Sequence, residues 1–233
     1  MGVKVQDKSL DKVTFGWIDG DNVSGAFTMG LMDAIFSTDV PFSSALRHRS
    51  VFVSKNRKDL LDNWIKYADT DWLFWVDSDI VLNKEAVEKI WDAADKDLRP
   101  VVSGLYFFPI QENNNLVIKP CIYNFSNHPH MGVFLDDFEK DSLVKVEGTG
   151  FGCLLMHRSV VEKLVKNSEV IDLFSFNAFS HEHTVTEDFN FFSYLLKYDI
   201  PVYAHTGAIV NHVKPMLVNE RLLDMVKSYN DKQ

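Results

Sequence analysis

The chain has 233 residues, and its 24 Lys and Arg against 33 Asp and Glu give a formal charge of −9 at pH 7. This balance argues against a broad nucleic-acid-binding face, because such a face depends on Lys and Arg that neutralise phosphates. With 46% hydrophobic residues and 18 Phe, the composition is that of a single folded domain rather than of a disordered or fibrous chain.

Cysteine content and the N-terminal sequence indicate a compartment. The two cysteines, Cys121 and Cys153, belong to no CxxC motif, which favours a reducing environment. The N-terminus is polar, and no apolar run is long enough to span a bilayer. We therefore expect a soluble, cytoplasmic protein without a transmembrane segment.

Strands and helices alternate in the first part of the chain. The fully apolar run WLFWV is typical of a strand covered on both faces. The predicted elements are a strand at 13–18, a helix ending before Pro41, a strand at 48–53, a helix ending at Asp69, a strand at 72–76, a helix capped by Asn83, and a strand at 100–107. This order predicts an open, mostly parallel α/β sheet with helices on both faces.

The second part begins without a helical period. Residues 111–147 contain strand-like segments and the turn ENNN, which predict a small antiparallel insertion. The later predictions are the strand GCLLMH, a helix at Val160–Val165, a long loop at 168–185, a helix from Thr186 that buries Phe189, Phe192 and Leu196, the separate strands PVYAH and AIVNH, and a terminal helix with Leu222, Leu223 and Val226.

Two carboxylates directly follow the apolar strand at 72–76. Asp77 and Asp79 flank Ser78, and in an open α/β sheet ligands bind at the carboxyl ends of strands. Paired carboxylates there suit a hard divalent ion such as Mg²⁺ or Mn²⁺. The alternative is an ordinary acidic turn before the next helix.

Glu187 and Asp188 stand in the first turn of the helix predicted from Thr186. Acidic residues there can simply complement the helix dipole. A carboxylate within hydrogen-bond reach of an acceptor hydroxyl can instead act as a general base.

Two histidines end the predicted strands near the C-terminus. His205 and His212 are each either structural residues or the imidazole that completes a carboxylate metal site.

The segment 47–58 holds five Lys and Arg and no acid, within an acidic chain. It is interpreted as a solvated basic face or as the electropositive edge of a diphosphate site. Asn56 and Arg57 follow the predicted strand at 48–53, which puts them near the sheet edge of Asp77.

Two further patterns are weaker. Gly148–Gly152 is not GxGxxG, so we interpret its glycines as a sharp turn or a close approach to a ligand. The run His181–His183 lacks a third ligand at metal-site spacing, which favours a substrate-contacting or merely exposed loop over zinc.

In order and spacing, the segments from Val13 to Pro215 resemble a GT-A glycosyltransferase of the family 2-like type found in bacteria and phages. The segments that carry the resemblance are SKNRKDLLDNWI, DTDWLFWVDSDIVL, VVSGLYF, EGTGFGCLLMHRSVVEKL and TEDFNFFSYLLKYDIPVYAHTGAIVNHVKP. The resemblance implies one GT-A (Rossmann-like) domain over 1–233, with a nucleotide-binding half at about 10–107, an acceptor half at about 108–215, and a C-terminal helix at 216–233.

The resemblance also implies residue roles. The implied metal ligands are Asp77, Asp79 and His212; the donor contacts Asp19, Asn56, Arg57, Asp77 and Ser78; the catalytic residues Asp188 and Glu187; and the acceptor or sugar contacts Gly150, Phe151 and His183. Mn²⁺ or Mg²⁺ would be the cofactor.

The implied reaction moves a sugar from a UDP- or GDP-sugar to an acceptor hydroxyl, with Asp188 as the base if the enzyme inverts. A retaining reaction stays open. The acceptor would be a glycan, a protein, a small molecule or a modified base, and a phage protein would act in the host cytoplasm. The alternatives are a nucleotidyltransferase acting on sugar phosphates and a catalytically silent domain that binds carbohydrate or a partner.

Overall fold

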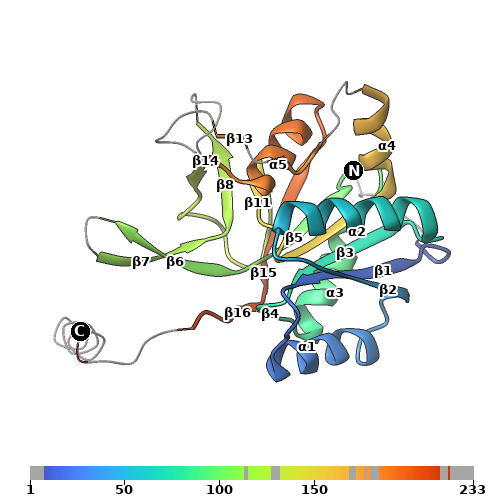
Figure 1. Cartoon of the computed structure of the whole chain (residues 1–233), viewed down its shortest axis with the longest axis horizontal. Coiled ribbons are helices and arrows are strands. Elements are labelled where there is room, and N and C mark those ends of the chain that lie inside the picture. Colours follow the sequence, from blue (N-terminus) through green and yellow to red (C-terminus); the bar gives the residue numbers. More distant parts are fainter. Residues whose placement is uncertain are drawn as a thin grey trace.

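The apolar segment predicted as a strand lies inside the main sheet of the computed structural model, which describes residues 8–112, 115–126, 132–167, 172–175, 177–178, 184–215 and 220 (Figure 1). The seven strands of this sheet follow the order β10 (Leu143–Val146), β15 (Val202–Ile209), β5 (Val101–Leu105), β12 (Cys153–His157), β3 (Trp72–Asp77), β1 (Val13–Asp19) and β2 (Phe42–Arg49).

The sheet is mixed but mostly parallel. β1 pairs in parallel with β2 and β3, and β15 with β5, whereas β12 runs antiparallel to both β3 and β5. The carboxyl ends of β1, β2, β3, β5 and β15 therefore meet at one edge, where β12 begins. The predicted fold class is confirmed, and this edge is the place where ligands bind in open α/β sheets.

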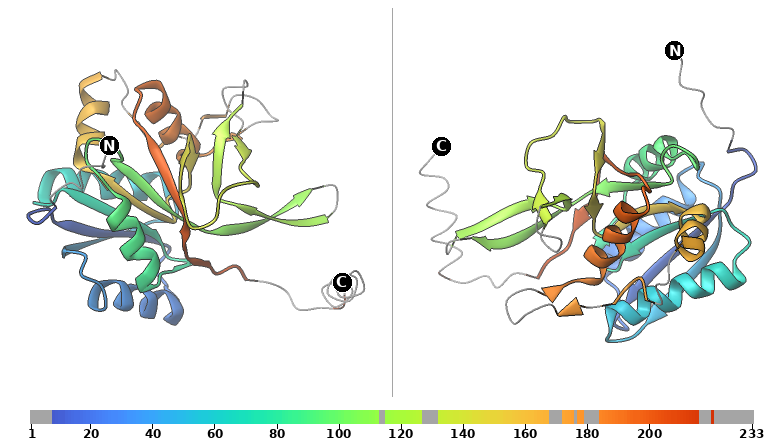
Figure 2. Two further views of the ribbon diagram at one scale, coloured as in Figure 1. Left: turned by 180° about the vertical axis from the view of Figure 1, so that it is seen from behind. Right: turned by 90° about the horizontal axis from the view of Figure 1, so that it is seen from above.

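Helices cover both faces of the sheet, as the two further views show (Figure 2). α2 (Val53–Tyr67), α4 (Arg158–Asn167) and α5 (Glu187–Lys197) bury side chains against one face, and α1 (Gly25–Phe36) and α3 (Lys84–Ala93) against the other. The predicted cap of α3 is confirmed, since the Asn83 side chain accepts a hydrogen bond from the Ala86 amide at 2.9 Å.

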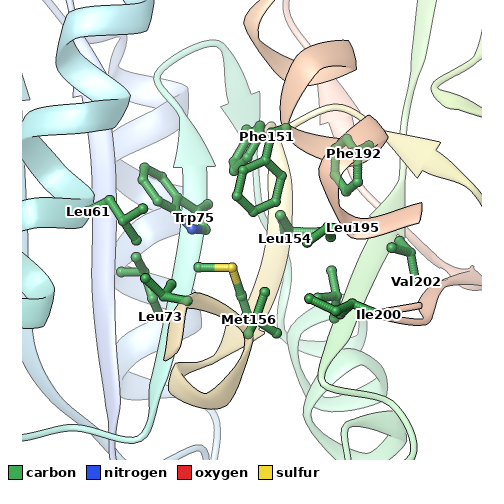
Figure 3. Packing of buried hydrophobic residues seen from close by; sticks show 14 of the residues in the cluster. Leu61, Leu73, Trp75, Phe151, Leu154, Met156, Phe192, Leu195, Ile200 and Val202 are labelled. Carbon is green, nitrogen blue, oxygen red and sulfur yellow. The ribbon is translucent and has the colours of Figure 1, made fainter. Parts of the chain in front are cut away.

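Aromatic and aliphatic side chains fill the space beneath α2, α4 and α5 (Figure 3). Trp75 of β3 is 1% exposed, and its ring lies edge-on to that of Phe151 at 5.2 Å. Phe151 in turn contacts the ring of Phe191 in α5 at 5.0 Å. This packing fixes the start of α5 relative to the end of β3, so the two acidic segments are held by one core.

Short antiparallel pairs make up the rest. They are β6 (Phe107–Glu112) with β7 (Asn115–Pro120); β8 (Ile122–Phe125) with β9 (Gly132–Phe134) and β11 (Gly148–Thr149); β13 (Asn177–Ala178) with β14 (Thr184–Val185); and β4 (Ile80–Val81) with β16 (Asn211–His212). The predicted antiparallel insertion is thus present, and its β6–β7 hairpin projects away from the main sheet (Figure 1).

The prediction of a strand at 48–53 is wrong. β2 occupies Phe42–Arg49 at the edge of the sheet, where its mixed polar sequence is tolerated because one side is open. Val51 and Phe52 are 86% and 66% exposed, and α2 begins at Val53. The apolar residues that suggested a strand lie in the connection between β2 and α2, beside the ligand-binding edge.

The two strands predicted after residue 200 are present, but their predicted bounds are wrong. Most of PVYAH and the first two residues of AIVNH form the single strand β15, whose pairing with β5 shifts register between His205 and Ile209, and Asn211 and His212 form the separate short strand β16. In α5 the buried aromatic residues are Phe191 and Phe192, and Leu196 is 45% exposed. The predicted terminal helix lies outside the described residues. Among the described helices, none has the length and apolarity needed to cross a membrane.

Candidate active site

Arg57 of α2 holds the carboxylate at the end of β3. Its two terminal nitrogens donate to both Asp77 oxygens at 3.0 and 3.1 Å, and its Nε donates to Glu187 at the start of α5 at 3.1 Å. The Arg57 guanidinium lies over the Phe151 ring, 4.7 Å from the centroid. Burial opposes the charge of Arg57, but the two carboxylates raise its pKa above the ordinary value. One buried cation therefore joins three elements of the site.

This network bears on the roles expected of two acidic residues, which stay predictions. Each Asp77 oxygen accepts one hydrogen bond from Arg57, which favours a structural role for this carboxylate over the metal role expected of it. Glu187 is 7% exposed and paired with Arg57, which fits a structural anchor better than a catalytic group.

Asp79 and His212 come together through the pairing of β4 with β16. His212 Nε2 lies 3.1 Å from Asp79 Oδ2, and His212 Nδ1 lies 2.9 Å from the Phe107 carbonyl oxygen. A carbonyl only accepts, so Nδ1 carries a proton, and Nε2 faces Asp79: it donates to the carboxylate when it too is protonated, and its lone pair can bind an ion when it is not. Metal-binding histidines are held in this way, with the second nitrogen donating to a carbonyl.

These two residues fit a divalent ion with few protein ligands. Mg²⁺ is commonly bound through one or two carboxylates together with substrate phosphates and water. No group of three or more His, Cys, Asp and Glu residues suited to a metal occurs within the described part of the chain. Any ion at Asp79 and His212 would thus take its other ligands from the substrate or from water.

Lys214 also contacts Asp79, with its ammonium 2.6 Å from Oδ2. Burial acts to raise the pKa of Asp79, but hydrogen bonds from His212 and Lys214 lower it to about 2. The carboxyl is therefore ionised at neutral pH.

A pocket of about 310 Å³ opens at the same edge of the sheet. It is lined by all five residues expected to contact the donor, namely Asp19, Asn56, Arg57, Asp77 and Ser78, together with Asp79 and the connection after β2. The structure thus gathers these residues from β1, α2 and β3, although it differs in how several of them are used.

Asp19 is one such difference. Its side chain is fully covered, and Arg47 donates to both of its oxygens, which lowers its pKa. Asp19 therefore bounds the pocket without a free carboxylate. Asn56 likewise donates to the Ser50 carbonyl, a contact that fixes the pocket wall.

The basic segment 47–58 is not a free electropositive edge. Each of its cations has a carboxylate partner, and the pairs are Arg47 with Asp19, Arg49 with Asp21, Lys55 with Asp59, Arg57 with Asp77 and Glu187, and Lys58 with Asp62. The positive charges of this segment are therefore largely paired with carboxylates of the protein itself.

Asp188 occupies the first turn of α5, next to Glu187. Its Oδ1 accepts hydrogen bonds from the Thr186 hydroxyl and from the Phe189 amide, and no hydrogen bond to Oδ2 is found among the described residues. Loss of solvent around it and the charge of Glu187 raise the pKa of Asp188. Asp188 does not line the 310 Å³ pocket, but it follows Glu187, the partner of the pocket residue Arg57, and a raised carboxyl pKa is typical of a group that accepts a proton.

The turn at Gly148–Gly152 packs against tyrosines. A Cβ at Gly150 would lie 2.1 Å from the Tyr106 hydroxyl, so this position requires glycine because of close approach. Phe151 is 1% exposed and supports Arg57 from below, which does not fit the expected direct contact with a sugar.

The other histidines considered for the site are His205 and His183. His205 lies within β15, where the Gly207 amide donates to it, and Lys89 and Asp141 are its charged neighbours. The structure thus brings His212 to Asp79 rather than His205. His183 and the rest of His181–His183 lie outside the described residues.

Sequence reasoning missed Lys214 and Tyr106. Lys214 stands two residues after His212, and that spacing was the available signal. Tyr106 follows β5 directly and is 5% exposed, so its hydroxyl reaches Gly152 only through the fold.

Residues 56–165 match the family model described as glycosyl transferase family 2. GalNAc-T7 with UDP, GalNAc and Mn²⁺ shares the fold at a TM-score of 0.53 and 9% identity, over 89% of this chain and 44% of that chain. A197 from STIV gives 0.48 at 19% identity over 89% and 97%, and the inositol-1-phosphate CTP transferase from T. maritima 0.48 at 10% over 93% and 94%. No curated protein matches.

Proposed function

We propose that this chain, a glycosyltransferase of GT-A fold with a family 2 segment at residues 56–165, moves a sugar from a UDP- or GDP-sugar to an acceptor hydroxyl with the help of Mn²⁺ or Mg²⁺. The observation that carries the proposal is the pairing of Asp79 with His212 beside a 310 Å³ pocket at the carboxyl edge of the sheet. Polar groups that converge on a pocket at such an edge are the usual mark of a nucleotide site.

The donor is assigned to the half of the chain before about residue 107. The pocket residues there come from β1, the connection after β2, α2 and the end of β3. In this proposal Asn56 and Ser78 face the nucleotide, and Arg57 keeps Asp77 in a fixed orientation at the pocket wall.

Asp79 and His212 would hold the metal ion, which when bound supplies positive charge to a leaving diphosphate. The support is chemical: the Phe107 carbonyl fixes the protonated nitrogen of His212, and Asp79 is ionised. The residues themselves contribute orientation, since β4 and β16 are paired at this point.

Asp188 is assigned as the general base from the acceptor half. One of its oxygens is held by Thr186 and Phe189, an arrangement that orients the second for a hydroxyl. The proton would pass from the acceptor oxygen to this carboxylate as that oxygen attacks the anomeric carbon. Such a role belongs to an inverting reaction, and Glu187 supports it by binding Arg57.

The test is a panel of UDP- and GDP-sugars incubated with the protein and Mn²⁺, with released nucleoside diphosphate as the readout. Water can replace the acceptor, so we expect slow release of UDP or GDP from one donor, abolished by EDTA and restored by Mn²⁺. Release of pyrophosphate from a nucleoside triphosphate and a sugar phosphate would instead identify a nucleotidyltransferase. Donor binding without any release, with every acceptor class supplied, would contradict catalysis.

A further inference from the structure

Lys214 and His212 bind the same oxygen of Asp79. The Lys214 ammonium lies 2.6 Å from Oδ2, and His212 Nε2 lies 3.1 Å from it. An ammonium is a compact point charge with three donors, and here it contacts the carboxylate oxygen that faces the imidazole. The place where the proposed metal ion would meet Asp79 is therefore already bordered by a cation of the chain itself.

The backbone around Lys214 is anchored to the segment Asp77–Asp79 and to β4, which follows it. β16 pairs with β4, and the Val213 amide donates to the Asp79 carbonyl oxygen at 2.7 Å. The Lys214 side chain follows this anchored segment and is 43% exposed. Its ammonium can thus leave Asp79 by rotation of the side chain, without breaking the pairing of β16 with β4.

We propose that Lys214 is a tethered cation that competes with a divalent metal ion for Asp79, so that the ion binds this carboxylate only as the ammonium moves away. The inference rests on the proposed metal site but adds a residue with an opposite effect: Asp79 and His212 favour the ion, and Lys214 opposes it. Two cations cannot share one carboxylate oxygen without repelling each other.

If the contact between Lys214 and Asp79 were only a surface ion pair, its loss would not change metal affinity. Exposed pairs contribute little to folding, so the loss of Lys214 should leave thermal stability nearly unchanged under either interpretation. The competition predicts a change in metal affinity, which a purely structural role would not produce.

The experiment measures free Mn²⁺ by electron paramagnetic resonance in titrations of the full chain, without nucleotide. The variants are K214M, which removes the charge; K214R, which keeps it; D79N, which removes the carboxylate; and K12M, which removes a charge paired with Asp69 far from the pocket. We expect K214M to bind Mn²⁺ about two- to fivefold more tightly than the wild type. K214R and K12M should not tighten binding, and D79N should lose the site.

The outcomes separate the two claims. Equal Mn²⁺ affinity of K214M and wild type, with loss in D79N, would overturn the role of Lys214 and leave the metal site standing. Tightening in K12M as large as in K214M would reduce the effect to net charge and also overturn it. Absence of Mn²⁺ binding in both wild type and K214M would overturn the metal site and the inference together.

Discussion

The guanidinium of Arg57 donates two hydrogen bonds, of 3.0 and 3.1 Å, to the carboxylate of Asp77, and this contact joins α2 to the end of β3. The same side chain reaches Glu187, so one buried arginine connects the donor side of the pocket with the first turn of α5. Asp77 is therefore held by the scaffold, and in the proposed site Asp79 is the carboxylate assigned to the metal ion.

Replacing Arg57 with Met should destabilise the protein strongly. Asp77 and Glu187 would keep their charges with no buried partner, which typically costs about 3 kcal/mol or more. The free energy of unfolding in urea measures this loss. The matched control is R49M, because Arg49 and Asp21 are each 60% exposed and such a pair contributes about 1 kcal/mol or less. Equal losses in the two variants would argue against the anchoring role of Arg57.

Gly150→Ala should also destabilise the fold. The added Cβ would overlap the Tyr106 hydroxyl, and forcing extra atoms into a packed site costs about 1–3 kcal/mol. Thermal unfolding compared with Gly25→Ala checks this, since a Cβ at Gly25 meets nothing within 4 Å. A Gly150→Ala protein as stable as the control would show that Tyr106 yields without cost.

Substitutions of Asp188 and Glu187 should have different effects on transfer and stability. For D188N we expect donor binding to survive and transfer to fall by about 10²–10⁴-fold, the range of a lost general base. For E187Q we expect lower stability, because Arg57 loses one charged partner, and a smaller effect on transfer. Calorimetric donor binding and initial rates give the comparison, and full transfer by D188N would remove it as the base.

The pH dependence of transfer should report the environment of Asp188. Because its pKa is raised, the base is lost on acidification at a higher pH than for an ordinary aspartate. The Thr186 hydroxyl stabilises the carboxylate, so T186V should move the acid limb of kcat/KM further upward. T28V is a suitable control, since the Thr28 hydroxyl donates to the backbone carbonyl of Ser24, the residue just before α1. An acid limb unmoved in T186V would contradict the assignment.

The sequence pattern correctly predicted features that depend mainly on residues close together in the chain. The fully apolar sequence of β3 predicted its burial, and its position predicted that Asp77 and Asp79 would lie at a ligand-binding edge. The cap of α3 by Asn83 followed from side-chain chemistry in the same way.

Tertiary pairing limited the rest. Whether Asp77 binds a metal or an arginine depends on where α2 crosses β3, and a charge pattern does not encode that crossing. Val51 and Phe52 have strand-like letters but lie exposed before α2, because the edge strand β2 had already ended. Lys214 meets Asp79 only because β16 returns to β4, a contact between residues far apart in the chain.

The central claim is that Asp79 and His212 bind a divalent ion that holds the donor diphosphate, and calorimetry of UDP and GDP with the wild type and D79A tests it most directly. We predict that one of the two nucleotides binds the wild type in the presence of Mn²⁺, binds much more weakly with EDTA, and loses this metal-dependent part in D79A. Mn²⁺-dependent binding that is unchanged in D79A would contradict the claim.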